Sequence, residues 1–251
     1  MRDSLSGYAP GMFAGKTVLI SGGTSGIGLE IARGFSRLGA TVIATGSSAE
    51  KIAACRRQQQ DSAIAFRQLD VRDSAQVGTL FDSLPALDIL VNAAGVARPE
   101  AEYEEDTFMQ VMDVNLNSVM RLSQAAIPLL LQREGCIVNV ASMLSYLADA
   151  LVPAYCASKS GVTGLTRSLA HRYGPQGVRI NAVAPGYHKT EMTRALWSDP
   201  DAATHICKRT ALKRWGSADD LTGAVIFLCS SAVHYITGVT LPVDVGYISG
   251  M

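Results

Sequence analysis

The sequence predicts an α/β fold: a single domain built on a doubly wound parallel sheet of about seven strands, with helices on both faces. Three observations predict it. Short β-branched runs alternate with longer helical patterns along the 251 residues, as in right-handed βαβ units. The strand candidates are continuous apolar runs, which suits a parallel sheet covered on both faces. The first candidate strand runs into a glycine-rich turn that opens a helix.

The elements follow one another in a regular order. We expect strands at residues 17–21, 41–45, 63–69, 88–91, 136–140, 179–183 and 239–243. The helical patterns between them cover residues 28–38, 49–59, 74–84, 107–132, 153–173 and 219–230.

No linker, repeat or low-complexity tract divides the chain, so residues 1–251 are predicted to form one dinucleotide-binding and catalytic domain, with residues 1–14 as an N-terminal extension. Residues 187–215 are too long for an ordinary connection. Long loops in compact domains are often lids, and we expect a substrate lid here, with short helices of its own or mobile; the alternative is an insertion without a function.

Composition excludes several classes of protein. Apolar residues make up 48% of the chain, charged residues 18%, and the net charge is +0, which favours a sizeable core and argues against a dedicated nucleic-acid or membrane-surface protein. There is no apolar run of 18 residues, and residues 1–13 lack the hydrophobic core of a signal peptide. We therefore expect a cytoplasmic protein that binds neither nucleic acid nor membrane.

The cysteines indicate neither disulfides nor a metal site. They are odd in number and widely spread, and no CxxC or Cys/His cluster occurs. Their positions are Cys55, Cys136, Cys156, Cys207 and Cys229.

The glycine-rich turn has the order Gly22-x3-Gly26-x-Gly28, directly after the first strand. Glycines there permit positive φ and let phosphates approach the backbone. The N-terminus of the following helix supplies free N–H groups and a positive dipole. The turn therefore predicts dinucleotide binding and, with the strand pattern, a Rossmann fold.

The end of the second strand bears on the choice of cofactor. An acid in that region binds the ribose 2′-hydroxyl of NAD, but residues 44–48 contain none. Ser47 or Ser48 could donate hydrogen bonds to a 2′-phosphate, although no arginine stands nearby in the sequence. The cofactor is predicted to be NAD(P), with NADP mildly favoured over NAD.

Tyr155 and Lys159 lie four residues apart in a predicted helix, so they share one face. A phenol has a pKa of about 10, and a neighbouring ammonium lowers it by favouring the phenolate. Such a pair suits proton transfer, although the same spacing is common among surface neighbours.

These features together resemble the short-chain dehydrogenase/reductase family, from about Gly15 to the C-terminus. The motifs that carry the resemblance are Ser21-Gly22-x3-Gly26-x-Gly28, Asn92-Ala93-Ala94-Gly95, Asn115, Ser142, Tyr155-x3-Lys159 and Pro185-Gly186. Two positions depart from the family pattern. Ser21 replaces the usual threonine and keeps its hydroxyl, and Val245 stands where glycine is expected near the C-terminus.

The resemblance implies an NAD(P)-dependent oxidoreductase and a role for each catalytic residue. Tyr155 resembles the general acid/base that exchanges a proton with the substrate oxygen, and Ser142 the hydroxyl that polarises the carbonyl. Lys159 would lower the pKa of Tyr155 and hold the nicotinamide ribose. Asn115 resembles the residue that positions a water connecting Lys159 to solvent.

The resemblance also implies cofactor contacts, which are spread over the carboxyl edge of the predicted sheet. Asp70 and Val71 resemble the pair beside the adenine, although Asp70 could instead cap the helix that begins near Asp73. Pro185 and Gly186 could be purely structural. The expected contacts are Gly22, Thr24, Ser25, Gly26, Ile27, Gly28, Ser47, Asp70, Val71, Asn92, Ala93, Gly95, Tyr155, Lys159, Pro185, Gly186 and Thr190.

The substrate is predicted less sharply. The chain resembles the sugar-acid and polyol branch, the gluconate 5-dehydrogenases and 2-deoxygluconate 3-dehydrogenases. A sugar acid needs a cation, for which His188, Lys189 and Arg194 are candidates. The expected substrate contacts are Ser142, Leu144, Tyr155, Tyr187 and His188.

Two alternatives remain open. The first is a 3-ketoacyl thioester (acyl carrier protein) reductase, for which the apolar residues Leu144, Leu147, Leu151, Met192 and Leu196 could line a pocket. The second is a catalytically idle dinucleotide sensor, although such a protein would be expected to have lost Tyr155, Lys159 or Ser142.

The resemblance further implies a homotetramer, with a dimer as the alternative. The expected contacts run through the helices at 107–132 and 153–173 and through the C-terminal strand.

Overall fold

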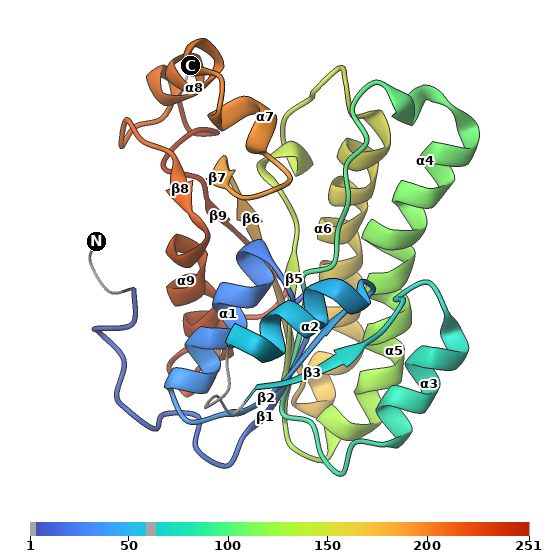
Figure 1. The fold of residues 1–251 in the computed structure, drawn as a ribbon. Helices are drawn as coiled ribbons and strands as arrows, with labels where there is room; N and C mark the ends of the chain where they lie inside the picture. The colour runs from blue at the N-terminus through green and yellow to red at the C-terminus, as the bar shows by residue number, and fades with distance from the viewer. Residues whose placement is uncertain (1–3, 59–63, 251) are drawn as a thin grey trace.

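A computed structural model describes residues 4–58 and 64–250. Its centre is a seven-stranded sheet in the order β3-β2-β1-β4-β5-β6-β9, and every neighbouring pair is parallel. The predicted doubly wound α/β fold is thereby confirmed (Figure 1). The strands are β1 (Thr17–Ser21), β2 (Thr41–Gly46), β3 (Ile64–Gln68), β4 (Ile89–Asn92), β5 (Cys136–Val140), β6 (Arg179–Pro185) and β9 (Thr240–Val243).

Helices cover both faces of this sheet (Figure 1). On one face, α1 (Gly26–Arg37), α2 (Ala49–Gln58) and α9 (Thr222–Cys229) bury Ile31, Ile52 and Val225 in a shared apolar cluster. On the other face, α3 (Ser74–Asp82), α5 (Ser118–Leu131) and α6 (Pro153–Tyr173) bury Leu80, Leu122 and Leu169. The helix α4 (Glu105–Met112) packs against α6.

Two predicted helices are not continuous. The pattern at 107–132 is α4, a π-helical turn at Asp113–Asn117 and then α5; the turn forms around the buried Asn115, whose side chain bonds to a neighbouring loop. The pattern at 219–230 begins with a 3₁₀ turn at Ala218–Leu221, because Ser217 and Asp220 form a capping box there. The predicted ends at residues 59 and 63 lie outside the described residues.

The strand order changes direction at β1: β2 and β3 lie on one side of it, and β4, β5, β6 and β9 lie on the other. All strands run in one direction, so the loops after β1, β2, β3, β4, β5 and β6 meet along one edge. In open α/β sheets, ligands bind in the crevice at such a switch point.

Residues 187–215 contain short elements of their own. These are β7 (His188–Lys189), α7 (Arg194–Trp197) and α8 (Pro200–Arg209), and β7 pairs with β8 (Gly216–Ser217) in a separate two-stranded sheet. Ile206 and Trp215 are buried in a small apolar cluster with Met143 and Tyr247, separate from the clusters on the two faces of the sheet.

The N-terminal residues 4–14 pack onto the domain. Leu5 and Phe13 are buried, the Phe13 ring meets Phe35 of α1 edge-on at 5.0 Å, and the Tyr8 hydroxyl donates a hydrogen bond to the Gly223 carbonyl. No helix within residues 4–58 and 64–250 has the length and apolarity to cross a membrane.

Val245 has a φ of 54°, in the left-handed region that β-branched residues avoid. Its carbonyl accepts hydrogen bonds from the amides of Ala211 and Leu212, and Asp244 accepts from the amides of Gly246 and Ile248. The turn is thus held by its neighbours, although the residue expected there was glycine.

Candidate active site

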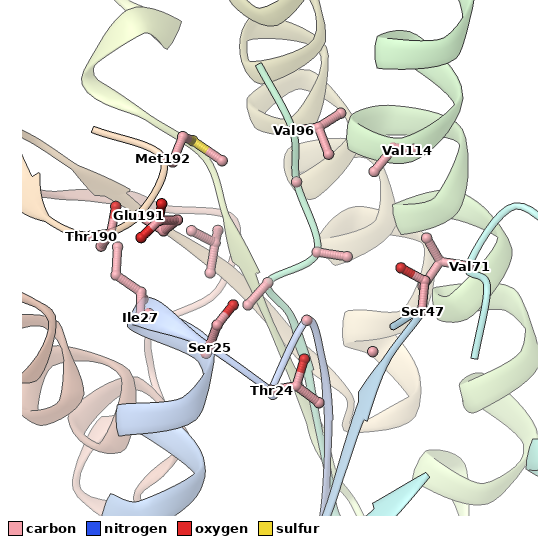
Figure 2. A pocket seen from close by; sticks show the side chains of 18 of the residues that line it. Thr24, Ser25, Ile27, Ser47, Val71, Val96, Val114, Thr190, Glu191 and Met192 are labelled. Carbon is pink, nitrogen blue, oxygen red and sulfur yellow. The ribbon is translucent and has the colours of Figure 1, made fainter. Parts of the chain in front are cut away.

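A cavity of about 480 Å³ runs along the carboxyl edge of the sheet. Figure 2 shows its walls: Thr24 and Ser25 on the glycine turn, Ser47 and Val71 on one side, and Thr190, Glu191 and Met192 on the other. Most of the site residues predicted from the sequence line this single cavity. They are Gly22, Thr24, Ser25, Gly26, Ile27, Gly28, Ser47, Asp70, Val71, Ala93, Gly95, Ser142, Tyr155, Lys159, Pro185, Gly186, His188 and Thr190.

The glycine turn is shaped by close backbone packing. Gly22 has a φ of 69°, and a β-carbon there would lie 2.7 Å from the Ala94 backbone. A β-carbon at Gly28 would lie 2.3 Å from the Gly22 carbonyl oxygen. The Ser25 side chain does not cap α1, and no acid stands in the first turn of that helix. The N-terminal amides of α1 can therefore donate hydrogen bonds to a phosphate, and the turn fits a dinucleotide.

Ser21 supports the opposite wall. Its buried hydroxyl accepts hydrogen bonds from the amides of Ala93 and Ala94, at 3.2 and 3.4 Å. The hydroxyl that replaces the family's threonine thus holds the turn after β4 against the glycine turn.

Tyr155 and Lys159 occupy the first two turns of α6. The Lys159 ammonium is buried, lies 5.5 Å from the centroid of the Tyr155 ring and donates a 2.7 Å hydrogen bond to the Val140 carbonyl. Helical spacing thus brings the two side chains to one place, at the end of β5.

Burial dominates the protonation of this pair. Burial raises the pKa of Tyr155, and the hydrogen bond with Ser142 only partly opposes that rise. Burial also lowers the pKa of Lys159 to about 8. Burial thus outweighs the hydrogen bonding that would lower the pKa of Tyr155, and the lowering of that pKa by Lys159 stays a prediction.

Ser142 lies at the end of β5, where it begins a short turn. Its buried hydroxyl accepts a hydrogen bond from the Leu144 amide at 3.1 Å, and it lies close enough to the Tyr155 phenol to lower the pKa of that phenol in opposition to burial. Two hydroxyl groups therefore face the same part of the cavity, as a carbonyl oxygen would require.

Asn115 is fully buried and does not line the cavity. Its Oδ1 accepts from the Val96 amide at 2.8 Å, and its Nδ2 donates to the Val96 carbonyl at 2.9 Å and to Ser158 at 3.2 Å. A β-carbon at Gly95 would lie 3.5 Å from both Asn115 Oδ1 and Lys159 Nζ. Asn115 thus fixes the loop after β4 beside Lys159, a task that the sequence did not reveal.

Asp70 lines the cavity and forms an ion pair with Arg72, with a 2.7 Å N–O distance. Hydrogen bonding from Arg72 lowers the pKa of Asp70. The helix α3 is capped by Asp73, which accepts from the amides of Ala75 and Gln76. The alternative that Asp70 caps this helix is therefore wrong.

Asn92 is buried beneath the cavity and does not line it. Its amide donates to Asn139 of β5 at 2.8 Å, and Asn139 donates to Thr166 of α6 at 2.9 Å. This polar chain fastens β4 to β5 and to α6.

The predicted substrate contacts divide between two cavities. His188 lines the first, where burial lowers its pKa and its Nδ1 bonds to the Gly186 carbonyl at 3.0 Å. Leu144 and Tyr187 line a second cavity of about 800 Å³, together with Leu147, Ile206 and Arg209. Burial raises the pKa of Tyr187 to about 12, so that phenol stays neutral.

The cations lining the first cavity are not the candidates named from the sequence. Lys189 is exposed and does not line it, and Arg194 pairs with Glu191. The lowered pKa of His188 favours its uncharged form. Arg98, Lys51 and Arg72 line it instead. Within the part of the chain that the structure describes, no carboxylate pairs with the Arg98 guanidinium, which donates to the Ala97 carbonyl.

A sequence signal for these cations exists but is weak. Arg98 comes three residues after the Asn92–Gly95 motif, and Lys51 comes four residues after Ser47. Both follow the carboxyl end of a strand, which is where parallel sheets place ligand contacts. Position after a strand is thus the signal that would have found them.

Known proteins resemble this chain over nearly its whole length. Residues 22–248 match the family model described as enoyl-(acyl carrier protein) reductase. A 2-dehydro-3-deoxy-D-gluconate 5-dehydrogenase of Bacillus subtilis is 38% identical over 97% of this chain and 99% of its own. A 3-oxoacyl-[acyl-carrier-protein] reductase of Rickettsia bellii is 34% identical over 94% and 98%.

Among solved structures, a gluconate 5-dehydrogenase of Burkholderia cenocepacia in complex with NADP and tartrate superposes with a TM-score of 0.89. It is 38% identical over 95% of this chain and 97% of that one.

Proposed function

The chain belongs to the short-chain dehydrogenase/reductase family, and we propose that it is an NADP-dependent oxidoreductase whose substrate is a sugar acid. In the reaction, hydride passes between the nicotinamide and a carbonyl or secondary alcohol. The observation that carries the choice of substrate is Arg98, an exposed guanidinium without a carboxylate partner among the described residues, in the same cavity as Ser142 and Tyr155.

The cofactor is expected to lie across the switch point. The backbone at Gly22 and Gly28 and the N-terminal amides of α1 would hold its phosphates. When bound, it supplies or accepts the hydride. At the end of β2, Ser47 and Lys51 would face the adenosine ribose, whereas the Ser48 hydroxyl donates to Glu50. Residues 44–48 themselves carry no acid, which favours the 2′-phosphate of NADP.

The chain's own residues would handle the proton and the oxygen. The Ser142 and Tyr155 hydroxyls would hold the substrate oxygen, and Tyr155 would donate its proton to it in reduction or accept one in oxidation. Lys159 would stabilise the phenolate that remains, and Arg98 would bind the substrate carboxylate by charge-assisted hydrogen bonds.

The ketoacyl alternative rests on apolar walls. Val96, Val114 and Met192 line the first cavity, and Leu144 and Leu147 line the second. A sugar acid would bind Arg98 through its carboxylate, whereas an acyl thioester has no carboxylate for Arg98 to bind. The sensor alternative has no support, because Ser142, Tyr155 and Lys159 lie together at the end of β5.

We also keep three broader proposals. Residues 187–215 would act as a lid over the cavity. The protein would assemble as a homotetramer, or else a dimer, through exposed apolar side chains such as Met109, Met120, Phe227 and Tyr235. It would work in the cytoplasm.

A panel assay tests the proposed function. Sugar acids, polyols, secondary alcohols and ketoacyl thioesters are each offered with NADPH or NADP⁺ and with NADH or NAD⁺, and nicotinamide absorbance is followed. We expect sugar acids with the NADP couple to give the highest kcat/KM. Preference for a ketoacyl thioester would overturn the substrate, and preference for NADH would overturn the cofactor.

A further inference from the structure

Glu102 is a fully buried carboxylate beside the candidate site, and neither the motifs nor the proposed chemistry uses it. It is 0% exposed, although acidic side chains are almost never fully buried unless paired. It lies in a short 3₁₀ turn at Ala101–Tyr103, between the loop after β4 and α4. Among the described residues, no cation forms an ion pair with it.

Both oxygens of this carboxylate accept backbone hydrogen bonds. Oε2 accepts from the amide of Tyr155 at 2.8 Å, and Oε1 accepts from the amide of Arg98 at 2.8 Å. One side chain therefore touches the backbone of the candidate acid/base and that of the candidate carboxylate anchor. Each oxygen of the side chain thus serves as an acceptor for one backbone amide.

The contact with Tyr155 replaces a missing helix cap. The residue before α6, Val152, has no side chain able to cap it, and Pro153 has no N–H. The amide of Tyr155 belongs to the first turn, whose N–H groups lack partners within the helix. Glu102 satisfies it from a distant turn, and the positive end of α6 offsets the cost of burying the negative charge.

The contact with Arg98 closes a turn. The Glu102 amide donates to the Arg98 carbonyl at 3.1 Å, so Arg98 and Glu102 are joined by both backbone and side chain. Further bonds fasten this turn to the loop before α6: the Glu100 amide donates to the Leu151 carbonyl, and the Tyr103 hydroxyl to the Ala150 carbonyl.

We propose that Glu102 is a positioning residue of the reaction, which fixes the backbone of Tyr155 relative to the turn that carries Arg98. The distance between proton donor and carboxylate anchor would then be set by one buried side chain. A substrate held by its carboxylate would present its carbonyl to Tyr155 only while both contacts last. This inference deepens the proposed function and rests on it.

The charge of Glu102 has a second, separable effect, since it contributes to the raised pKa of Tyr155. The other groups that face Tyr155 are the Lys159 ammonium, the Cys156 thiol and the Ser142 hydroxyl, with Asp149 facing Cys156. Removing the Glu102 charge should therefore move any limb of the pH profile that reports Tyr155 to lower pH.

The test uses Glu102→Gln, Glu102→Asp and the matched control Glu104→Gln, which changes an exposed glutamate two residues away. Glutamine keeps one acceptor but turns an NH2 group toward the other amide, and aspartate keeps the charge but loses reach. We expect kcat for D-gluconate with NADP⁺ to fall about 10- to 100-fold in both Glu102 variants. The Kd for NADPH should stay within about threefold, and Glu104→Gln should match wild type.

The pH profile separates charge from geometry. Glu102→Gln should shift it to lower pH, whereas Glu102→Asp should lose rate without a shift. If Glu102→Gln does not fold, Glu102→Asp still carries the test. A wild-type kcat in either variant overturns the proposal, and so does an equal loss in Glu104→Gln.

Hydrogen exchange keeps the two proposals distinguishable. Exchange in peptides that contain the amides of Arg98 and Tyr155 should speed up about tenfold in Glu102→Gln and not in Glu104→Gln. Unchanged exchange overturns the role of Glu102 even if the enzyme oxidises sugar acids. A wild-type protein that turns over no sugar acid overturns the proposed function, and the exchange result still decides whether Glu102 holds the two segments together.

Discussion

The two ends of the first cavity are built in different ways. At the cofactor end, backbone fits against backbone: a β-carbon at Gly22 or Gly28 would collide with main-chain atoms at 2.7 or 2.3 Å. At the proposed substrate end, side chains from separate segments converge, namely Arg98 from the loop after β4, Ser142 from the end of β5 and His188 from residues 187–215. The first end is fixed by the fold, whereas the second depends on side chains that can be exchanged without moving the sheet.

The difference has a functional meaning. A backbone cradle recognises what all dinucleotides share, because phosphates are bound by amides that every residue has. Side chains on irregular segments recognise what distinguishes one substrate from another. Changes at the two ends should therefore separate cofactor binding from substrate binding, and removal of the proton donor where the ends meet should affect the chemistry alone.

The largest effect is expected where the ends meet. Tyr155→Phe removes the proton donor but keeps the ring, so kcat should fall about 10²- to 10⁴-fold while NADPH binding, followed by fluorescence titration, is kept. Tyr146→Phe is the control, because that phenol is half exposed and only weakly bonded to the Thr240 carbonyl. Near-normal turnover in Tyr155→Phe would remove Tyr155 from the chemistry.

Breaking the cofactor end should cost both folding and binding. Gly22→Ala places a β-carbon against Ala94 at a φ of 69°, so the free energy of unfolding should fall by roughly 2–4 kcal/mol and NADPH affinity with it. Gly78→Ala is the control, since nothing lies within 4 Å of its β-carbon in α3; it should gain about 0.5–1 kcal/mol. Urea unfolding measures both, and a neutral Gly22→Ala would mean that the cradle is not tight.

A substitution of Lys159 tests how much the burial of its ammonium group, where the two ends of the cavity meet, destabilises the folded protein. Its pKa falls from 10.5 to about 8, which corresponds to roughly 3 kcal/mol. Lys159→Met also loses the hydrogen bond to Val140, worth about 1 kcal/mol. The variant should therefore be inactive yet about 2 kcal/mol more stable near pH 7.

The sign of the pH dependence follows from linkage. Between pH 8 and 10.5 the unfolded chain binds the proton that the folded protein has lost, so wild-type stability gains from this group as pH rises through that window. The advantage of Lys159→Met should shrink accordingly. Urea unfolding at pH values from about 7 to 10 measures this, with Lys189→Met, an exposed lysine, as the control. A constant difference across the window would contradict the lowered pKa.

Arg98→Met should break the substrate end alone. The loss of a hydrogen bond to a charged group, about 1.5–3 kcal/mol, should raise the KM for a sugar acid roughly 10- to 100-fold and leave the Kd for NADPH unchanged. Arg194→Met is the control, because Arg194 already pairs with Glu191. The reverse outcome, with Arg194 decisive and Arg98 neutral, would favour the cation named from the sequence.

The smallest effect is expected at Lys51, the exposed cation of the cofactor end. Lys51→Met should weaken NADPH binding by about two- to fivefold, as for an exposed ion pair. NADH serves as the internal control in the same titration, because it lacks the 2′-phosphate. An equal loss for both cofactors would mean that Lys51 does not read that phosphate.

The sequence predicts the cofactor end better than the substrate end, because the first is built from local backbone patterns and the second from side chains on separate segments. The turn from Gly22 to Gly28 and the pair Tyr155 and Lys159 are local patterns, and each fold element brings its own residues into place. Arg98 reaches the cavity through a loop conformation that no periodicity reveals. The burial that raises the pKa of Tyr155 was missed because it depends on the surrounding fold, and Glu102 was missed because its partners are 4 and 53 positions away.

Because of the π-helical turn at Asp113–Asn117, the number of residues between α4 and α5 helps to determine the geometry of the site. There the Ser118 amide reaches back five residues to the Asp113 carbonyl, one more than an α-helix uses. Each residue turns a helix by about 100°, so deleting one residue would join α4 and α5 smoothly but rotate Val111 out of the cavity wall. In this stretch an insertion or deletion should therefore harm the protein more than most substitutions. The rotation of α4 about its own axis relative to α5 should be kept even where the residues of α4 change.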